Sequence, residues 1–200
     1  MSLDPAATPP AALRPVVARV AALNGACFVV EIAVALAIAS VALVMDSLDF
    51  LEDAAINLLI LAGLGWSARN RARLGTGLAF LLILPALAGA YAAWDKFSDF
   101  TPPAPLPLML TGLGAFAVNL ACATMLAKHR LGSGSLTRAA YLSARNDTVA
   151  NLAVVAAGLT TVFVPSPWPD LVAAGLIAIL NADSAIDILR AAAAERRAAG

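Results

Sequence analysis

Six long apolar stretches alternate with short polar segments along the chain. The stretches cover residues 17–39, 42–64, 75–95, 106–127, 138–162 and 168–189. A helix needs about 20 mostly apolar residues to cross a lipid bilayer, and each stretch is long enough to do so. The pattern therefore predicts an all-α integral membrane protein, with six transmembrane helices in a domain that covers residues 16–190.

The segments outside these stretches are short. Residues 1–15 are Pro-rich and have no positively charged start before an apolar core, so they do not resemble a signal peptide. We expect residues 1–15 to be disordered and residues 191–200 to form a short cytoplasmic tail. The Pro-rich segments 101–107 and 165–170 are expected to be loops, because proline cannot continue a helix.

Basic residues concentrate on one side of the predicted membrane domain. That side contains both ends of the chain and the segments 66–74 and 128–137, whereas the other side has Lys96 alone. Loops on the cytoplasmic side of a membrane are enriched in Lys and Arg. We therefore expect both termini in the cytoplasm, and we expect the protein in a bacterial cytoplasmic (inner) membrane.

The composition excludes an ordinary soluble protein. Hydrophobic residues make up 61% of the chain and charged residues only 13%, whereas a globular domain has roughly 25% charged residues. Lys and Arg balance Asp and Glu, so no basic tract for nucleic acid is present. Cys27 and Cys122 lie in apolar stretches and form no C-x-x-C motif, so we expect buried thiols.

Several carboxylates lie inside the predicted spans, where each costs about 2.5–3.5 kcal/mol to insert. They are Glu31 in the first span, Asp46, Asp49, Glu52 and Asp53 in the second, and Asp147 in the fifth. Arg145 is the one basic candidate partner, and it lies near the cytoplasmic end of its span. A buried ion pair would explain one acid, so the others indicate a binding site for a cation.

Helical spacing brings these acids together on two faces. At about 100° per residue, one face of the second span and one face of the fifth span each carry a stack of polar residues. These are Asp46, Asp49, Asp53 and Asn57 in the second span, and Ser143, Asp147 and Asn151 in the fifth. All of them offer oxygen ligands, which suit a divalent metal ion.

The two acidic segments also resemble each other. Both contain the pattern D-x-x-x-N-L, which begins at Asp53 and at Asp147, 94 residues later. The alternation of the spans makes these two helices run in opposite directions. This is the expected trace of an inverted repeat that relates helices 1–3 to helices 4–6, and transporters with such repeats bind their cargo at the repeat interface.

These motifs resemble the transmembrane domain of the cation diffusion facilitator family over roughly residues 17–190. The resemblance rests on Asn24 and Glu31, on SVALVMDSLDFLED at 40–53, on SARNDTVANLAV at 143–154 and on WPDL at 168–171. Members of that family have six helices and cytoplasmic termini, and they export divalent metals in exchange for protons. The chain resembles short members without the cytoplasmic C-terminal domain, because little sequence follows the sixth span.

The resemblance implies a four-ligand metal site, with one i, i+4 pair from helix 2 and one from helix 5. Asp49 and Asp53 match the Asp-x-x-x-Asp form of the helix 2 pair. Asp147 matches the acid of the helix 5 pair, which is usually His-x-x-x-Asp. Ser143 stands at the histidine position. It is either a weak ligand, a residue that binds the metal through a water, or a small residue that serves helix packing.

The other polar residues near these faces are expected to support the site or to line the cation pathway. Asp46 has three open roles, as a ligand, as an acid on the access route or as a partner of the ligands. Glu31 is either a proton relay or a polar contact to another helix. Asn57, Asn151 and Asn146 are expected to contact the ligands or to join helices.

Two acids near the end of the sixth span form a separate cluster. Asp183 and Asp187 are spaced i, i+4, and Arg190 follows them. We expect an interfacial salt bridge there, with a second metal site as the alternative.

The leading hypothesis is a proton-coupled exporter of a divalent transition metal that works by alternating access, and not an enzyme. No permanently bound cofactor is expected. Zn²⁺ is the first candidate cargo, and an all-oxygen site leaves Cd²⁺, Fe²⁺, Co²⁺ and Mn²⁺ open. The expected partners are the metal ion, protons, the lipid bilayer and a second copy in a homodimer, and no nucleic acid.

Two other classes were weighed against this hypothesis. An intramembrane aspartyl protease also needs two membrane aspartates, but it is expected to show a G-x-G-D segment, which this chain lacks. A non-transporting membrane scaffold or regulator gives no reason for stacked acids in the second span.

Overall fold

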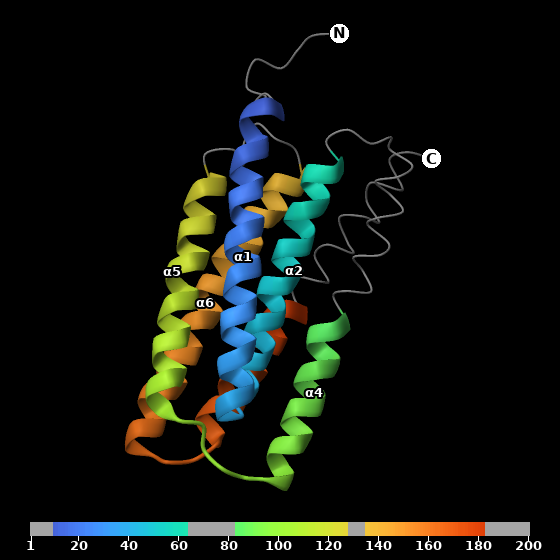
Figure 1. The fold of residues 1–200 in the computed structure, drawn as a ribbon. Helices are drawn as coiled ribbons and strands as arrows, with labels where there is room; N and C mark the ends of the chain where they lie inside the picture. Colours follow the sequence, from blue (N-terminus) through green and yellow to red (C-terminus); the bar gives the residue numbers. More distant parts are fainter. Residues whose placement is uncertain (1–9, 64–82, 128–134, 183–200) are drawn as a thin grey trace.

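The structure is a computed structural model that describes residues 10–63, 83–127 and 135–182. Within these residues every regular element is a helix, as the apolar pattern predicts (Figure 1). The labelled helices are α1 (Pro10–Ile38), α2 (Val41–Gly63), α4 (Ile83–Ser98), α5 (Pro105–Ala127) and α6 (Ser135–Phe163). A further helix covers Trp168–Ala182.

Two helices begin inside the Pro-rich segments that were expected to be loops, although within one residue of the spans predicted at 106–127 and 168–189. The 101–107 segment was expected to be a loop, but α5 begins at Pro105. The last helix likewise begins at Trp168, inside the 165–170 segment. Proline is tolerated in the first turn of a helix, where its missing N–H group has no intrahelical partner to lose. Both loops are therefore shorter than predicted, and α1 begins at Pro10, within the segment expected to be disordered.

The helices alternate in direction. Figure 1 shows that the α1–α2, α4–α5 and α6 to Trp168–Ala182 connections lie at one end of the bundle. As a result α2 and α6, which carry the two similar acidic segments, run in opposite directions and pack against each other. This antiparallel arrangement is what the alternation of the spans predicts, and the inverted repeat of helices 1–3 and 4–6 stays a prediction.

Apolar helices of membrane-spanning length are present, although fewer than the six predicted spans. By length and composition, Leu13–Ile38 and Pro105–Ala127 are long and apolar enough to cross a membrane among the described residues, and Trp168–Ala182 is a shorter apolar helix. Helix α2 differs from these because its 23 residues include four carboxylates.

Side-chain burial is inverted relative to a soluble protein. Large apolar side chains such as Val29, Leu36 and Leu110 are at least 60% exposed on the outside of the bundle. Polar side chains such as Asp46 and Asn151 are fully buried inside it. Apolar side chains face outward and polar ones inward when the surrounding solvent is lipid, so the packing supports an integral membrane protein.

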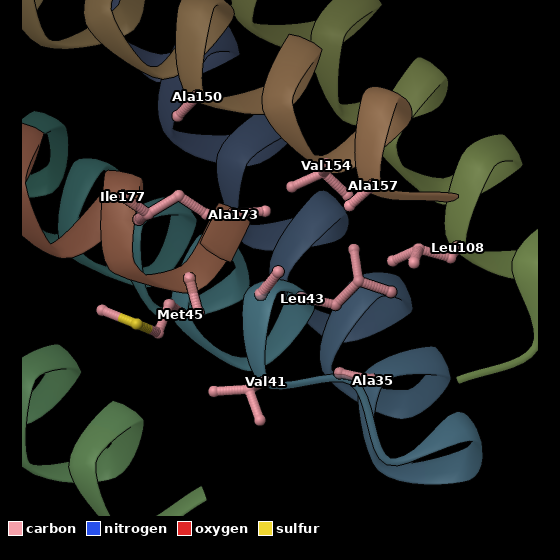
Figure 2. Packing of buried hydrophobic residues seen from close by; sticks show 12 residues of the cluster. Ala35, Val41, Leu43, Met45, Leu108, Ala150, Val154, Ala157, Ala173 and Ile177 are labelled. Atoms are coloured by element: carbon pink, nitrogen blue, oxygen red, sulfur yellow. The ribbon is translucent and has the colours of Figure 1, made fainter. Parts of the chain in front are cut away.

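Two clusters of buried apolar residues hold the bundle together at different heights. The first joins α1, α2, α5, α6 and the Trp168–Ala182 helix, and Figure 2 shows Leu43, Val154 and Ile177 converging there. The second joins α1, α2 and α5 around Val20 and Ile60. Between the two clusters, α2 contributes the residues of its acidic segment.

Candidate metal centre

A layer of buried polar side chains lies between the two apolar clusters. We call this set the polar layer, and its members come from four helices and are at most 8% exposed. They are Asn24 and Glu31 from α1, Asp46, Asp49, Asp53 and Asn57 from α2, Asn119 from α5, and Asp147 and Asn151 from α6. Burial removes these side chains from water, so charges in this layer are poorly solvated.

The two D-x-x-x-N segments make the same local contact. The Asn57 Nδ2 donates to the main-chain oxygen of Asp53 at 2.8 Å, and the Asn151 Nδ2 donates to that of Asp147 at 2.7 Å. Each asparagine thus turns its NH₂ group to its own helix. The Oδ1 atoms of Asn57 and Asn151 are buried and accept no hydrogen bond, so they remain available as oxygen donors within the layer.

The predicted ligands Asp49, Asp53 and Asp147 are all buried in this layer. Among the α2 carboxylates, Asp53 interacts most strongly with Asp147 through charge, and Asp49 comes next. The α2 acids therefore lie near enough to the α6 acid for their charges to interact, and their pairing as metal ligands stays a prediction.

The acids do not form a closed coordination shell. No group of three or more His, Cys, Asp and Glu side chains in the described part of the chain is close enough to hold a metal ion. Like-charged carboxylates repel one another at short range, so drawing them onto one point requires either a bound cation or protonation of the acids.

Asn181 is a polar contact of this site that sequence reasoning missed. It belongs to the Trp168–Ala182 helix, and its Nδ2 donates to Asp49 Oδ1 at 2.7 Å. The other carboxylate oxygen, Asp49 Oδ2, is buried and accepts no hydrogen bond. An asparagine one helical turn after Ile177, in an otherwise apolar stretch, was the available signal.

Glu31 and Asp46 lie together across the α1–α2 contact. The strongest side-chain interaction that either carboxyl makes is with the other. None of their four oxygens has a hydrogen bond that meets ordinary geometry. Of the alternatives left open for Glu31, the structure gives it a polar neighbour on another helix, and that neighbour is an acid.

A second buried polar group joins three helices at the end of the bundle where α2 begins. The Asp170 carboxylate accepts hydrogen bonds from Ser40 Oγ at 2.5 Å, from the Val41 N–H at 2.7 Å and from the Ala42 N–H at 3.3 Å. A carboxylate at a helix N-terminus satisfies free N–H groups and is favoured by the helix dipole. Asp170 therefore caps α2 from another helix.

Lys96 completes this end of the bundle. It is buried in the last turn of α4, and its Nζ donates to the main-chain oxygen of Ala39 at 2.7 Å. Ala39 has a positive φ of 51°, which lets the chain reverse tightly between α1 and α2. From the sequence, Lys96 was expected only to be the lone basic residue on its side of the membrane, and this contact was not predicted.

The chain matches the family described as the cation efflux transmembrane domain over residues 17–195. It belongs to the cation efflux family. This match covers most of the chain, including both acidic segments, and it confirms the resemblance drawn from the motifs. A search of curated proteins found no match.

Membership in the cation efflux family makes this chain a membrane domain for cation efflux. The family also favours transport over the protease alternative, because its members are transporters.

The remaining predicted positions are Ser143, Asn146, Asp183 and Asp187, and the structure describes the side chain of Asn146 alone among them. Ser143 lies in α6, but its side chain is outside the described residues. Asn146 is half-buried and interacts with other groups. Asp183 and Asp187, the alternative second site, lie outside the described residues, so that prediction stays a prediction.

Proposed function

We propose that this cation efflux protein exports a divalent transition metal by proton antiport, with Zn²⁺ as the first candidate cargo. It works by alternating access in a bacterial cytoplasmic membrane, with both termini in the cytoplasm and as a homodimer. The observation that carries the proposal is the polar layer, in which buried carboxylates from antiparallel α2 and α6 face each other between two apolar clusters. Such acids are costly in a membrane unless they bind a cation or a proton.

In this proposal Asp49, Asp53 and Asp147 bind the ion directly. Ser143 is a weak ligand or binds through a water, because it lies one helical turn before Asp147. The free amide oxygens of Asn57 and Asn151 supply neutral oxygen donors or hold a water of the ion. This donor set is hard and histidine-free, so Cd²⁺, Fe²⁺, Co²⁺ and Mn²⁺ remain candidate cargoes.

Proton coupling follows from the chemistry of the ligands. A carboxylate must be ionised to bind a metal, so metal binding displaces protons and tightens as pH rises. Glu31 and Asp46 provide a neighbouring carboxyl pair where a displaced proton can reside. Metal moving in one direction then drives protons in the other.

The test is flux in proteoliposomes with an imposed pH gradient and a panel of divalent metals. We expect metal uptake to acidify the opposite compartment, and we expect Glu31→Gln to weaken this coupling more than it weakens metal binding. Asp95→Asn is the matched control, since Asp95 is exposed at the end of α4. Flux that ignores the gradient would indicate a uniporter, and the absence of metal flux would overturn the proposal.

A further inference from the structure

The hydrogen bond between Asn181 and Asp49 joins the Trp168–Ala182 helix to α2, and the two residues are 132 positions apart in the sequence. It holds one oxygen of the carboxylate, Oδ1, and leaves Oδ2 buried without a hydrogen bond. Asparagine has a low helix propensity, and an amide in an apolar helix needs a partner to offset its burial. Asn181 is half-buried, and Asp49 is that partner.

The position of Asn181 is fixed by the rest of its helix. Asp170, Ala174, Ile177 and Asn181 follow one another at intervals of three or four residues, so they share one face. Asp170 binds the first turn of α2, Ile177 packs in the apolar cluster, and Asn181 reaches Asp49. The helix therefore contacts α2 at two points along its length, at the first turn through Asp170 and at Asp49 through Asn181. Together these two contacts orient the Asp49 carboxylate.

The donor is a neutral amide, and this matters for a carboxylate that must bind a cation. A Lys or Arg in its place would compete with the metal for the same negative charge. An amide orients the carboxylate and leaves its charge available. Because Oδ1 is already engaged, Asp49 can offer the ion one oxygen more readily than two.

We propose that Asn181 is a positioning residue that holds Asp49 for ligation through Oδ2 alone and thereby favours small divalent ions over large ones. This inference rests on the proposed metal export function. Zn²⁺ is bound by four ligands in most sites. Larger ions take more oxygen ligands and often use both oxygens of one carboxylate. Freeing Oδ1 should therefore benefit a large ion more than a small one.

The experiment measures Zn²⁺ and Cd²⁺ flux in proteoliposomes, separately and in competition, because Cd²⁺ has the same charge and a larger radius. The variants are Asn181→Ala, which removes the hydrogen bond, and Asn181→Leu, which removes it while keeping side-chain volume. Asn181→Gln keeps the amide. Thr161→Val is the control, since the Thr161 hydroxyl is buried in α6 and donates only to its own helix, at Ala157 O.

Losing a partner of a metal ligand typically weakens metal affinity about 10–100-fold. We expect the Zn²⁺ KM to rise about tenfold in the Ala and Leu variants, with Vmax and the Cd²⁺ KM nearly unchanged. The Gln variant and Thr161→Val should keep more of the wild-type Zn²⁺/Cd²⁺ ratio. A merely structural role would lower Vmax for both ions or raise both KM values together.

An unchanged Zn²⁺/Cd²⁺ ratio in both the Ala and the Leu variants would overturn the inference, and so would an equal rise of both KM values. These outcomes leave the proposed function standing, because the wild-type protein still moves metal. A wild-type protein that moves neither ion overturns the proposed function itself. The two failures are therefore distinguishable in one set of measurements.

Discussion

Replacing Asp170 with alanine should destabilise the bundle by removing the cap of α2. The change leaves the N–H groups of Val41 and Ala42 without their acceptor, at residues that are 2% and 0% exposed. Each unsatisfied buried donor costs about 1–3 kcal/mol. The bond to Ala42 is long at 3.3 Å, so we take about 3 kcal/mol for the two groups together.

This loss can be measured by thermal unfolding in detergent. For a chain of this size 1 kcal/mol shifts Tm by about 2–4 °C, so Asp170→Ala should lower Tm by about 6–12 °C. Asp170→Asn keeps one acceptor oxygen and should lose about half as much. Asp95→Ala removes an exposed carboxylate at the same end of the bundle and should change stability by at most about 0.5 kcal/mol.

The reasoning is refuted if Asp170→Ala unfolds at the same temperature as Asp95→Ala. Ser40 would then be sufficient as the cap, because its Oγ also accepts from the Leu43 N–H at 3.2 Å. The double variant Ser40→Ala with Asp170→Ala tests whether the two caps act together. If they do, the loss of stability in the double variant differs from the sum of the losses in the single variants.

Three further predictions concern the site and the helix packing. Asp53→Ala and Asp147→Ala should each abolish metal flux without lowering expression, because removing a carboxylate from the membrane lowers the cost of insertion; near wild-type flux in either would make the site assignment wrong. Ser143→His supplies an imidazole nitrogen one turn before Asp147 and should shift competitive flux from Mn²⁺ toward Zn²⁺, whereas an unchanged ratio would mean that residue 143 does not face the ion. Gly158→Ala should lower Tm, because the added Cβ would lie 2.5 Å from an α5 side-chain atom and 3.0 Å from the α5 backbone. Gly114→Ala is the control and should leave Tm unchanged, because nothing lies within 4 Å of its Cβ. Equal Tm values for the two variants would show that α5 and α6 can separate at no cost.

The local features of the site could be predicted from the sequence. Residues on one face of a helix follow from its fixed turn of about 100° per residue. The stack of Asp49, Asp53 and Asn57 and the matching stack at Asp147 and Asn151 depend on nothing else. The backward hydrogen bonds of the two asparagines are local as well, since each joins residues four apart.

The end of the loop predicted at 101–107 was wrong, because it overlaps the first turn of α5. The sequence shows where a helix cannot continue through proline, but Pro105 lies where α5 begins, and a first-turn proline looks the same in the sequence as a loop proline. The path of the chain between two packed helices decides whether a given proline lies in a loop or in the first turn of a helix.

The contacts between helices were decided by the tertiary structure. Asp170 caps α2 across 129 residues of sequence, and Asn181 reaches Asp49 across 132. Such contacts depend on how far each helix is rotated and shifted against its neighbours. Side-chain packing sets that rotation and shift, for example where Gly158 lets α5 approach α6. Helical periodicity determines which residues share a face, but the neighbour that the face meets depends on the packing of the whole bundle.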